Sequence, residues 1–214
     1  MKYTIIPVTP FMQNCSLLIC ETSQRAALVD PGGDTERILA TVAKAGVTLE
    51  KIFLTHGHLD HAGGAGTIAH QLGIPIEGPQ RSEEALIQSL PEQGRHFGLG
   101  FGGEAFTPNR WLEQGDVVNF GEQTLEVSYC PGHTPGHVIY FHRASAMAWV
   151  GDVLFAGSIG RTDLPGGDHR ALIRSIRERL WPLGDEVEFV PGHGPNSTFG
   201  RERRTNPFVA DDLF

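Results

Sequence analysis

The chain has 214 residues, of which 40% are hydrophobic and 20% are charged, and it carries a formal net charge of −8. This composition is typical of a globular protein with a substantial core, and it excludes a disordered chain. An acidic surface repels phosphate backbones and anionic lipid head groups, so neither nucleic acid nor a membrane is an expected partner.

The N-terminal segment has one positive charge and an apolar stretch that Pro7 interrupts, unlike a secretory signal. No window approaches the roughly 18 apolar residues of a membrane helix. The three cysteines are too few, and odd in number, for a disulfide framework, so we expect Cys15, Cys20 and Cys130 to be small buried side chains. We therefore expect a protein of a reducing compartment, the cytoplasm.

The first half of the chain alternates short apolar runs with helical patterns. Strands are predicted where β-branched and apolar residues gather between polar turns, at residues 4–8, 15–20, 26–29, 51–54 and 74–76. A helix is predicted to begin after Asp34, a suitable N-cap, and to end at Gly46, because apolar residues recur at helical spacing between them. A second helix is predicted from about residue 61 to residue 72, where Gly73 ends it.

The second half consists mostly of strands, predicted at residues 117–120, 124–129, 138–142, 146–150 and 187–190. Helices are predicted at 82–90 and 168–180. Residues 91–109 are rich in glycine without a clear period; we interpret them as a long surface connection, with a lid over the site as the alternative. Strands with interspersed helices in both halves predict an α/β fold, in which two sheets pack face to face with helices outside, in one domain over residues 1–214.

Histidines gather where one of these strands ends. His56, His58 and His61 lie within six residues, with Asp60 among them, directly after the apolar run that ends at Leu54. A turn after a strand lets side chains converge without breaking the sheet. Imidazole nitrogen and carboxylate oxygen bind zinc, iron or manganese, and the absence of cysteine disfavours a closed structural zinc site.

Three more candidate ligands also follow apolar strands directly. They are His133, Asp152 and His193, each with a glycine beside it that lets the backbone approach closely. Pro-Gly-His occurs at both histidines, which indicates one turn geometry used twice. A single histidine in a loop is usually just solvated, but seven suitable residues in strand-end turns indicate a metal centre.

This ligand pattern resembles that of the metallo-β-lactamase superfamily over essentially the whole chain. The resemblance implies a four-layer αββα sandwich with the site at one edge, between the sheets. It also implies two divalent metal ions, with zinc favoured and iron or manganese as alternatives. By position, one ion is held by His56, His58 and His133, the second is held by Asp60, His61 and His193, and Asp152 bridges them.

More specific stretches are similar to the glyoxalase II-like branch, and to its compact bacterial members in particular. These stretches are Gln13-Asn14-Cys15, Val29-Asp30-Pro31-Gly32-Gly33, Pro131-Gly132-His133-Thr134-Pro135-Gly136-His137, Gly160-Arg161-Thr162-Asp163 and Glu202-Arg203-Arg204-Thr205-Asn206-Pro207-Phe208. The resemblance implies hydrolysis of a small-molecule thioester such as S-lactoylglutathione by a hydroxide that bridges the two metal ions.

Further roles follow from this interpretation. Asp60 and Asp152 are the candidate catalytic residues, and Asp60 could assist by moving protons. Arg161 is the candidate contact for an acidic group of the substrate, with a salt bridge as the alternative. Asp30 is a candidate for orienting a ligand histidine, with a simple turn cap as the alternative.

The C-terminal region departs from the larger glyoxalase II enzymes. Those enzymes add a helical domain that grips glutathione, whereas only 21 residues follow His193 here. Glutathione specificity is therefore open. The alternatives are a mononuclear iron persulfide dioxygenase, which binds iron through counterparts of His56, His133 and Asp152, a lactone, β-lactam or other ester hydrolase on the same scaffold, and a non-catalytic metal-binding or partner-binding domain. We expect a monomer or a small homo-oligomer.

Overall fold

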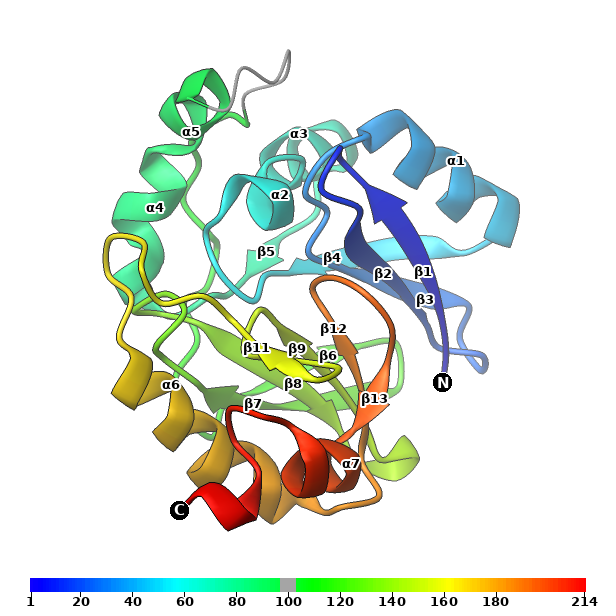
Figure 1. Cartoon of the computed structure of the whole chain (residues 1–214). Helices are drawn as coiled ribbons and strands as arrows, with labels where there is room; N and C mark the ends of the chain where they lie inside the picture. The colour runs from blue at the N-terminus through cyan, green and yellow to red at the C-terminus, as the bar shows by residue number, and fades with distance from the viewer. Residues whose placement is uncertain (97–102) are drawn as a thin grey trace.

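The structure, a computed structural model, describes residues 1–96 and 103–214 of the chain. Two sheets pack face to face, with α1, α2 and α3 outside one of them and α6 and α7 outside the other (Figure 1). The predicted αββα sandwich is confirmed. No helix among the described residues is long and apolar enough to cross a membrane.

The first sheet has the order β1-β2-β3-β4-β5. Its strands are β1 (Lys2–Val8), β2 (Gln13–Ile19), β3 (Arg25–Val29), β4 (Thr48–Phe53) and β5 (Ile76–Glu77). The first three are antiparallel, and β3, β4 and β5 are parallel to one another. All five predicted strands are present here, with ends shifted by a few residues.

The second sheet has the order β13-β12-β9-β8-β7-β6. Its strands are β6 (Val117–Phe120), β7 (Gln123–Tyr129), β8 (Val138–His142), β9 (Met147–Gly151), β12 (Glu188–Pro191) and β13 (Ser197–Thr198). β9 and β12 are parallel, and their neighbours are antiparallel to them. A small hairpin of β10 (Leu154–Phe155) and β11 (Ser158–Ile159) stands apart from both sheets. The sequence pattern did not predict β10, β11 or β13, which have two residues each.

The helices cover the outer faces and one side of the sandwich. They are α1 (Thr35–Ala45), α2 (Leu59–Ala62), α3 (Ala65–Leu72), α4 (Glu84–Gln88), α5 (Leu90–His96), α6 (His169–Ser175) and α7 (Phe199–Thr205). The prediction of a single helix over residues 61–72 was wrong. The helix is interrupted between α2 and α3, where the N–H of Gly64 donates to the carbonyl of Pro31 (2.9 Å). Asp34 precedes α1 as expected, but its carboxylate accepts the N–H of Thr9 rather than capping the helix.

Part of the glycine-rich stretch is also helical. α5 covers residues that the sequence assigned to an irregular connection, and residues 97–102 of that stretch lie outside the described residues. The predicted helix at 168–180 is confirmed as α6 followed by a π-helical turn at Ile176–Leu180.

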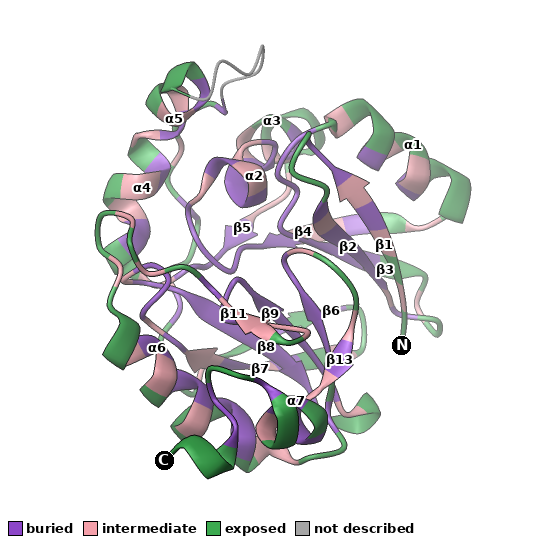
Figure 2. Ribbon diagram, in the orientation of Figure 1, coloured by how far each residue is buried: buried purple, intermediate pink, exposed green. Residues whose placement is uncertain are grey.

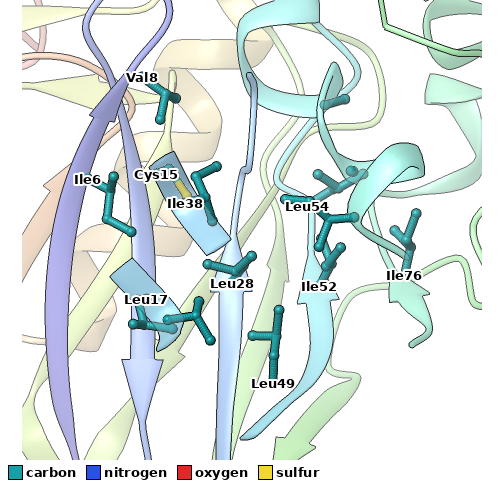
Figure 3. Close-up of a cluster of buried hydrophobic side chains, with 14 of the residues drawn as sticks. Ile6, Val8, Cys15, Leu17, Leu28, Ile38, Leu49, Ile52, Leu54 and Ile76 are labelled. Atoms are coloured by element: carbon teal, nitrogen blue, oxygen red, sulfur yellow. The ribbon is translucent and has the colours of Figure 1, made fainter. Parts of the chain in front are cut away.

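Apolar side chains fill three layers, because successive residues of a strand point to opposite faces of the sheet. Leu17, Leu28 and Ile52 face the outer helices (Figure 3). Leu18 and Phe53, their neighbours along the chain, face the second sheet. The strands between the helical layers are accordingly buried over much of their length, while the outer helix faces are exposed (Figure 2). This packing fixes the edge at which the strands of both sheets end.

Candidate metal centre

The seven candidate ligands lie in turns at one edge of the sandwich. His56 and His58 follow β4 of the first sheet, and Asp60 and His61 are in the short helix α2. The other three follow strands of the second sheet: His133 follows β7, Asp152 follows β9 and His193 follows β12. Because β9 and β12 are parallel, their carboxyl ends meet at the same edge, and β8 begins there because it is antiparallel to β9.

Three histidines form one group that could hold a metal ion. Nδ1 of His58 lies 3.1 Å from Nε2 of His56 and 3.0 Å from Nε2 of His133. One ligand atom from each residue lies within 4.8 Å of the others. Three imidazole nitrogens at this spacing are suited to a divalent transition metal.

Asp60, His61 and His193 form a second group, in which one ligand atom from each residue also lies within 4.8 Å of the others. Oδ2 of Asp60 is 3.1 Å from Nε2 of His193 and 3.7 Å from Nε2 of His61. Asp152 lies between the two groups: its Oδ1 is 3.3 Å from Nε2 of His61, and its Oδ2 is 3.6 Å from Nε2 of His133. One carboxylate therefore faces both groups.

Two buried atoms in this cluster lack a hydrogen bond of acceptable geometry within the described part of the chain. They are Nε2 of His61 and Oδ1 of Asp152, which face one another. Buried polar atoms are normally paired, so an orphaned nitrogen and an orphaned carboxylate oxygen indicate a missing partner. A cation that accepts both as ligands satisfies them, and the residues fit a metal centre.

Hydrogen bonds behind the ligands fix which ring nitrogen faces the site. Nδ1 of His61 lies 2.9 Å from Oδ2 of Asp30, whose two oxygens also accept the N–H (2.7 Å) and the hydroxyl (2.6 Å) of Thr55. Nδ1 of His133 lies 2.8 Å from the carbonyl oxygen of Arg161. Because a carbonyl only accepts, this Nδ1 carries the proton and Nε2 keeps its lone pair for a ligand. Asp30 therefore contacts a candidate ligand, as the orienting hypothesis requires.

The pKa shifts of the histidines and aspartates in the cluster indicate charges that suit a bound cation. Burial lowers the pKa of His56 and of His58, to about 4 for His58, and repulsion from neighbouring imidazoles adds to the effect. Burial raises the pKa of Asp60 and of Asp152, but the interactions with His61, His193 and the other neighbouring histidines together outweigh it, and the net shift is downward. Burial lowers the pKa of His61, but Asp152 and Asp60 outweigh it and raise the pKa overall. Ionised carboxylates thus face imidazoles at close range, a field that a divalent cation neutralises.

The model of the metallo-beta-lactamase superfamily matches residues 8–193. The chain belongs to this superfamily. Together with the histidine–aspartate cluster, membership makes it a metallo-hydrolase of that superfamily, and the predicted resemblance is confirmed.

The similarity to known proteins covers nearly all of the chain. Hydroxyacylglutathione hydrolase GloC of Haemophilus influenzae is 44% identical over 210 residues, which are 98% of each chain. The solved structure of BLEG-1 B3 metallo-beta-lactamase has a TM-score of 0.89 at 34% identity and covers 97% of this chain and 99% of its own. The structure of TTHA1623 in a di-iron-bound form has a TM-score of 0.87 at 36% identity, over 96% of this chain and 100% of its own.

Two of the family-like stretches have a structural role at this edge. The side chain of Asn14 in β2 donates to the carbonyls of Pro191 (3.0 Å) and Gly194 (2.9 Å), on either side of His193. A Cβ on Gly192 would lie 2.0 Å from Oδ1 of Asp152, so the backbone of this turn touches the site. The expected close approach of glycine is confirmed there.

The C-terminal stretch holds the β10–β11 hairpin that leads to Arg161. Glu202 is buried, accepts the hydroxyl of Ser197, and accepts the N–H of Gly157 (2.7 Å) and the side-chain amide of Asn206 (2.9 Å). The same amide of Asn206 donates to the carbonyl of Ser158 (3.1 Å). Apart from the family-like stretch at residues 202–208, nothing in the sequence indicated that Glu202 and Asn206 would be buried and hydrogen-bonded to each other.

Arg161 lies in the lining of a cavity of about 280 Å³ at the ligand cluster. Its guanidinium pairs with both carboxylate oxygens of Asp163, at 2.7 Å each, and both side chains are exposed. The salt-bridge alternative is therefore present, and contact of Arg161 with a substrate stays a prediction. Phe11, Leu59 and Leu164 supply apolar surface to the same cavity.

His137 follows the first Pro-Gly-His turn but is outside both groups of ligands. Its Nε2 accepts the N–H of Asp152 (3.1 Å), and its ring stacks on His56 with centroids 4.6 Å apart. It therefore supports the candidate ligands from behind. Glu83 and Gln93, which contact the loops of the ligands, were not predicted from the sequence.

Proposed function

We propose that the protein hydrolyses a small-molecule thioester, with S-lactoylglutathione as the first candidate, at a centre of two divalent metal ions. The observation that carries the proposal is the position of Asp152 between two three-residue groups of ligands. The 44% identity to hydroxyacylglutathione hydrolase GloC supports the thioester as substrate.

In this proposal the ligands divide as the two groups do. His56, His58 and His133 would hold one ion, Asp60, His61 and His193 would hold the other, and Asp152, which lies between the two groups, would be a ligand to both. Zinc is favoured for nitrogen and oxygen ligands, and iron or manganese are alternatives. We further propose that residues 1–214 act as one domain, as a monomer or a small homo-oligomer.

Bound metal ions supply an activated water nucleophile at neutral pH and polarise the carbonyl group that it attacks. The protein orients the reaction. Asp152 and Asp60 line the cavity with side chains 12% and 19% exposed, so their oxygens are within reach of a substrate. A leaving thiol with a pKa of about 8.5 departs as thiolate, so no strong general acid is required, and the ionised carboxylate of Asp60 is the candidate acceptor for the proton of the attacking water.

The cavity selects the substrate by its lining. Phe11, Leu59 and Leu164 favour a substrate with apolar surface next to the scissile bond. Arg161 favours a carboxylate, but only one that displaces Asp163. A thioester with a small acyl group and a remote carboxylate satisfies both conditions.

The test is turnover of a substrate panel by metal-free protein reconstituted in turn with zinc, iron and manganese. The panel contains S-lactoylglutathione, an uncharged thioester, a lactone, a β-lactam and glutathione persulfide. The proposal predicts thioester cleavage, lost on His58→Ala and on Asp60→Ala. Cleavage of only the lactone or the β-lactam would contradict it, as would oxygen consumption on the persulfide with a single iron per chain.

A further inference from the structure

Glu83 connects two of the loops that carry candidate ligands. The N–H of Gly57, which lies between His56 and His58, donates to its Oε2 at 2.8 Å. The N–H of Gly136, in the loop of His133, donates to its Oε1 at 2.6 Å. These donors are 26 and 53 residues from Glu83 along the chain, so one side chain joins segments that are remote in the sequence.

The contact is close because both donors are glycines. A Cβ on Gly136 would lie 2.6 Å from Cγ of Glu83, and a Cβ on Gly57 would lie 2.9 Å from Cβ of Leu86. Only bare backbone can approach the carboxylate from both sides. Gln80 adds a further bond to the same loop, since its N–H donates to the carbonyl of Gly136 (3.0 Å).

Gln93 also holds the first of these loops, through the next two peptide groups along the chain. Its side-chain oxygen accepts the N–H of Leu59 (2.9 Å), and its amide donates to the carbonyl of Gly57 (3.3 Å). Residues 80–93 therefore hold the ligand loops by several polar contacts. A surface connection, which the sequence predicted from residue 91 onward, would not need these hydrogen bonds to the ligand loops.

The carboxylate of Glu83 is fully buried and has no basic partner. No cationic side chain within residues 1–96 and 103–214 pairs with it, and residues 97–102 include no lysine, arginine or histidine. Burial raises the pKa of Glu83, and the N–H groups of Gly57 and Gly136 oppose that rise. An uncompensated buried charge is costly, so it is expected only where a positive charge nearby offsets the cost.

We propose that Glu83 is a positioning residue for metal binding. Its two oxygens hold the loop of His56 and His58 at a fixed distance from the loop of His133, so that the three imidazoles converge. Its negative charge lies behind these loops and favours a cation between them. The inference rests on the proposed function, because it needs the metal centre assigned there.

The test compares Glu83→Gln, which keeps the shape and removes the charge, with Glu84→Gln as a matched control. The side chain of Glu84 is 46% exposed and pairs only loosely with Arg81, at 3.8 Å. Zinc affinity of the metal-free proteins is measured by competition with a chelator, and the cobalt-substituted forms are compared by their visible spectra. We expect Glu83→Gln to weaken binding about 10- to 100-fold and to alter the spectrum, and Glu84→Gln to do neither.

A purely structural role predicts a different result. Glu83→Gln would then lower the melting temperature while zinc affinity and the cobalt spectrum stay as in Glu84→Gln, and the inference would be overturned. Wild-type protein that binds no metal would overturn the proposed function as well, so the two failures are distinguishable.

A second measurement does not depend on the variant folding. In metal-free wild-type protein, hydrogen exchange read by NMR should show the amides of Gly57 and Gly136 protected, since both donate to a buried carboxylate. Rapid exchange of either amide would mean that Glu83 does not hold that loop, and it would overturn the inference.

Discussion

Replacement of Asp30 by asparagine tests how the protein orients a ligand. The carboxylate accepts three hydrogen bonds: two from Thr55, at 2.7 and 2.6 Å, and one from Nδ1 of His61, at 2.9 Å. An amide oxygen in place of Oδ2 keeps two of these bonds, but the amide nitrogen then faces the N–H of Thr55 and leaves it unpaired. Since the site is buried, the free energy of unfolding should fall by about 1–3 kcal/mol.

Metal affinity should fall further than this stability loss alone explains. A neutral amide is a weaker acceptor than a carboxylate for the Nδ1 proton of His61, so Nε2 becomes a poorer ligand. We expect zinc affinity about 10- to 100-fold lower than in wild type, measured by chelator competition, with stability measured by urea unfolding of the metal-free protein.

Asp34→Asn provides the matched control in the same turn. Asp34 is exposed, and among the described residues its carboxylate accepts the N–H of Thr9, at 2.9 Å, away from the candidate ligands. Its replacement should change stability by less than about 0.5 kcal/mol and leave zinc affinity unchanged. If Asp30→Asn binds zinc as tightly as Asp34→Asn does, the orienting role of Asp30 is refuted.

Three more predictions concern the cavity, the hairpin and the metal. Asp163→Asn frees the guanidinium of Arg161, so KM for a thioester with carboxylates should fall by about two- to fivefold, while KM for an uncharged thioester stays constant. Glu202→Gln leaves buried donors of Ser197, Gly157 or Asn206 unpaired, and urea unfolding should show a loss of about 1–3 kcal/mol without loss of metal. Removal of metal by a chelator should lower the melting temperature, and zinc but not magnesium should restore it; an unchanged melting temperature would contradict a metal centre in the folded protein.

The strands and the cluster of candidate ligands were predictable because their pattern is local. β3, β8 and β9 are buried on both faces, and β6 and β7 alternate between buried and more exposed residues; both patterns are visible in a window of about five residues. The run from His56 to His61 combines suitable ligands within six residues, so it identifies the site without tertiary information. The single-domain assignment and the oligomeric state stay predictions.

The features that the sequence did not predict depend on contacts between segments that are distant along the chain. The break between α2 and α3 follows from the bond of Gly64 to Pro31, which no helical periodicity contains. Glu83 accepts backbone N–H groups 26 and 53 residues away, and one of two adjacent glutamates in a polar segment is normally read as a surface residue. The side chain of Arg161 could not be assigned either, since its pairing with Asp163 depends on the turn after β11.

The metal content of the purified protein tests the central claim most directly. Elemental analysis of the wild-type chain should give about two ions per chain, and His193→Ala, which removes a ligand from one group only, should retain the ion of the other group. One ion per chain in the wild type, lost altogether on His58→Ala and unaffected by His193→Ala, would contradict a centre of two metal ions.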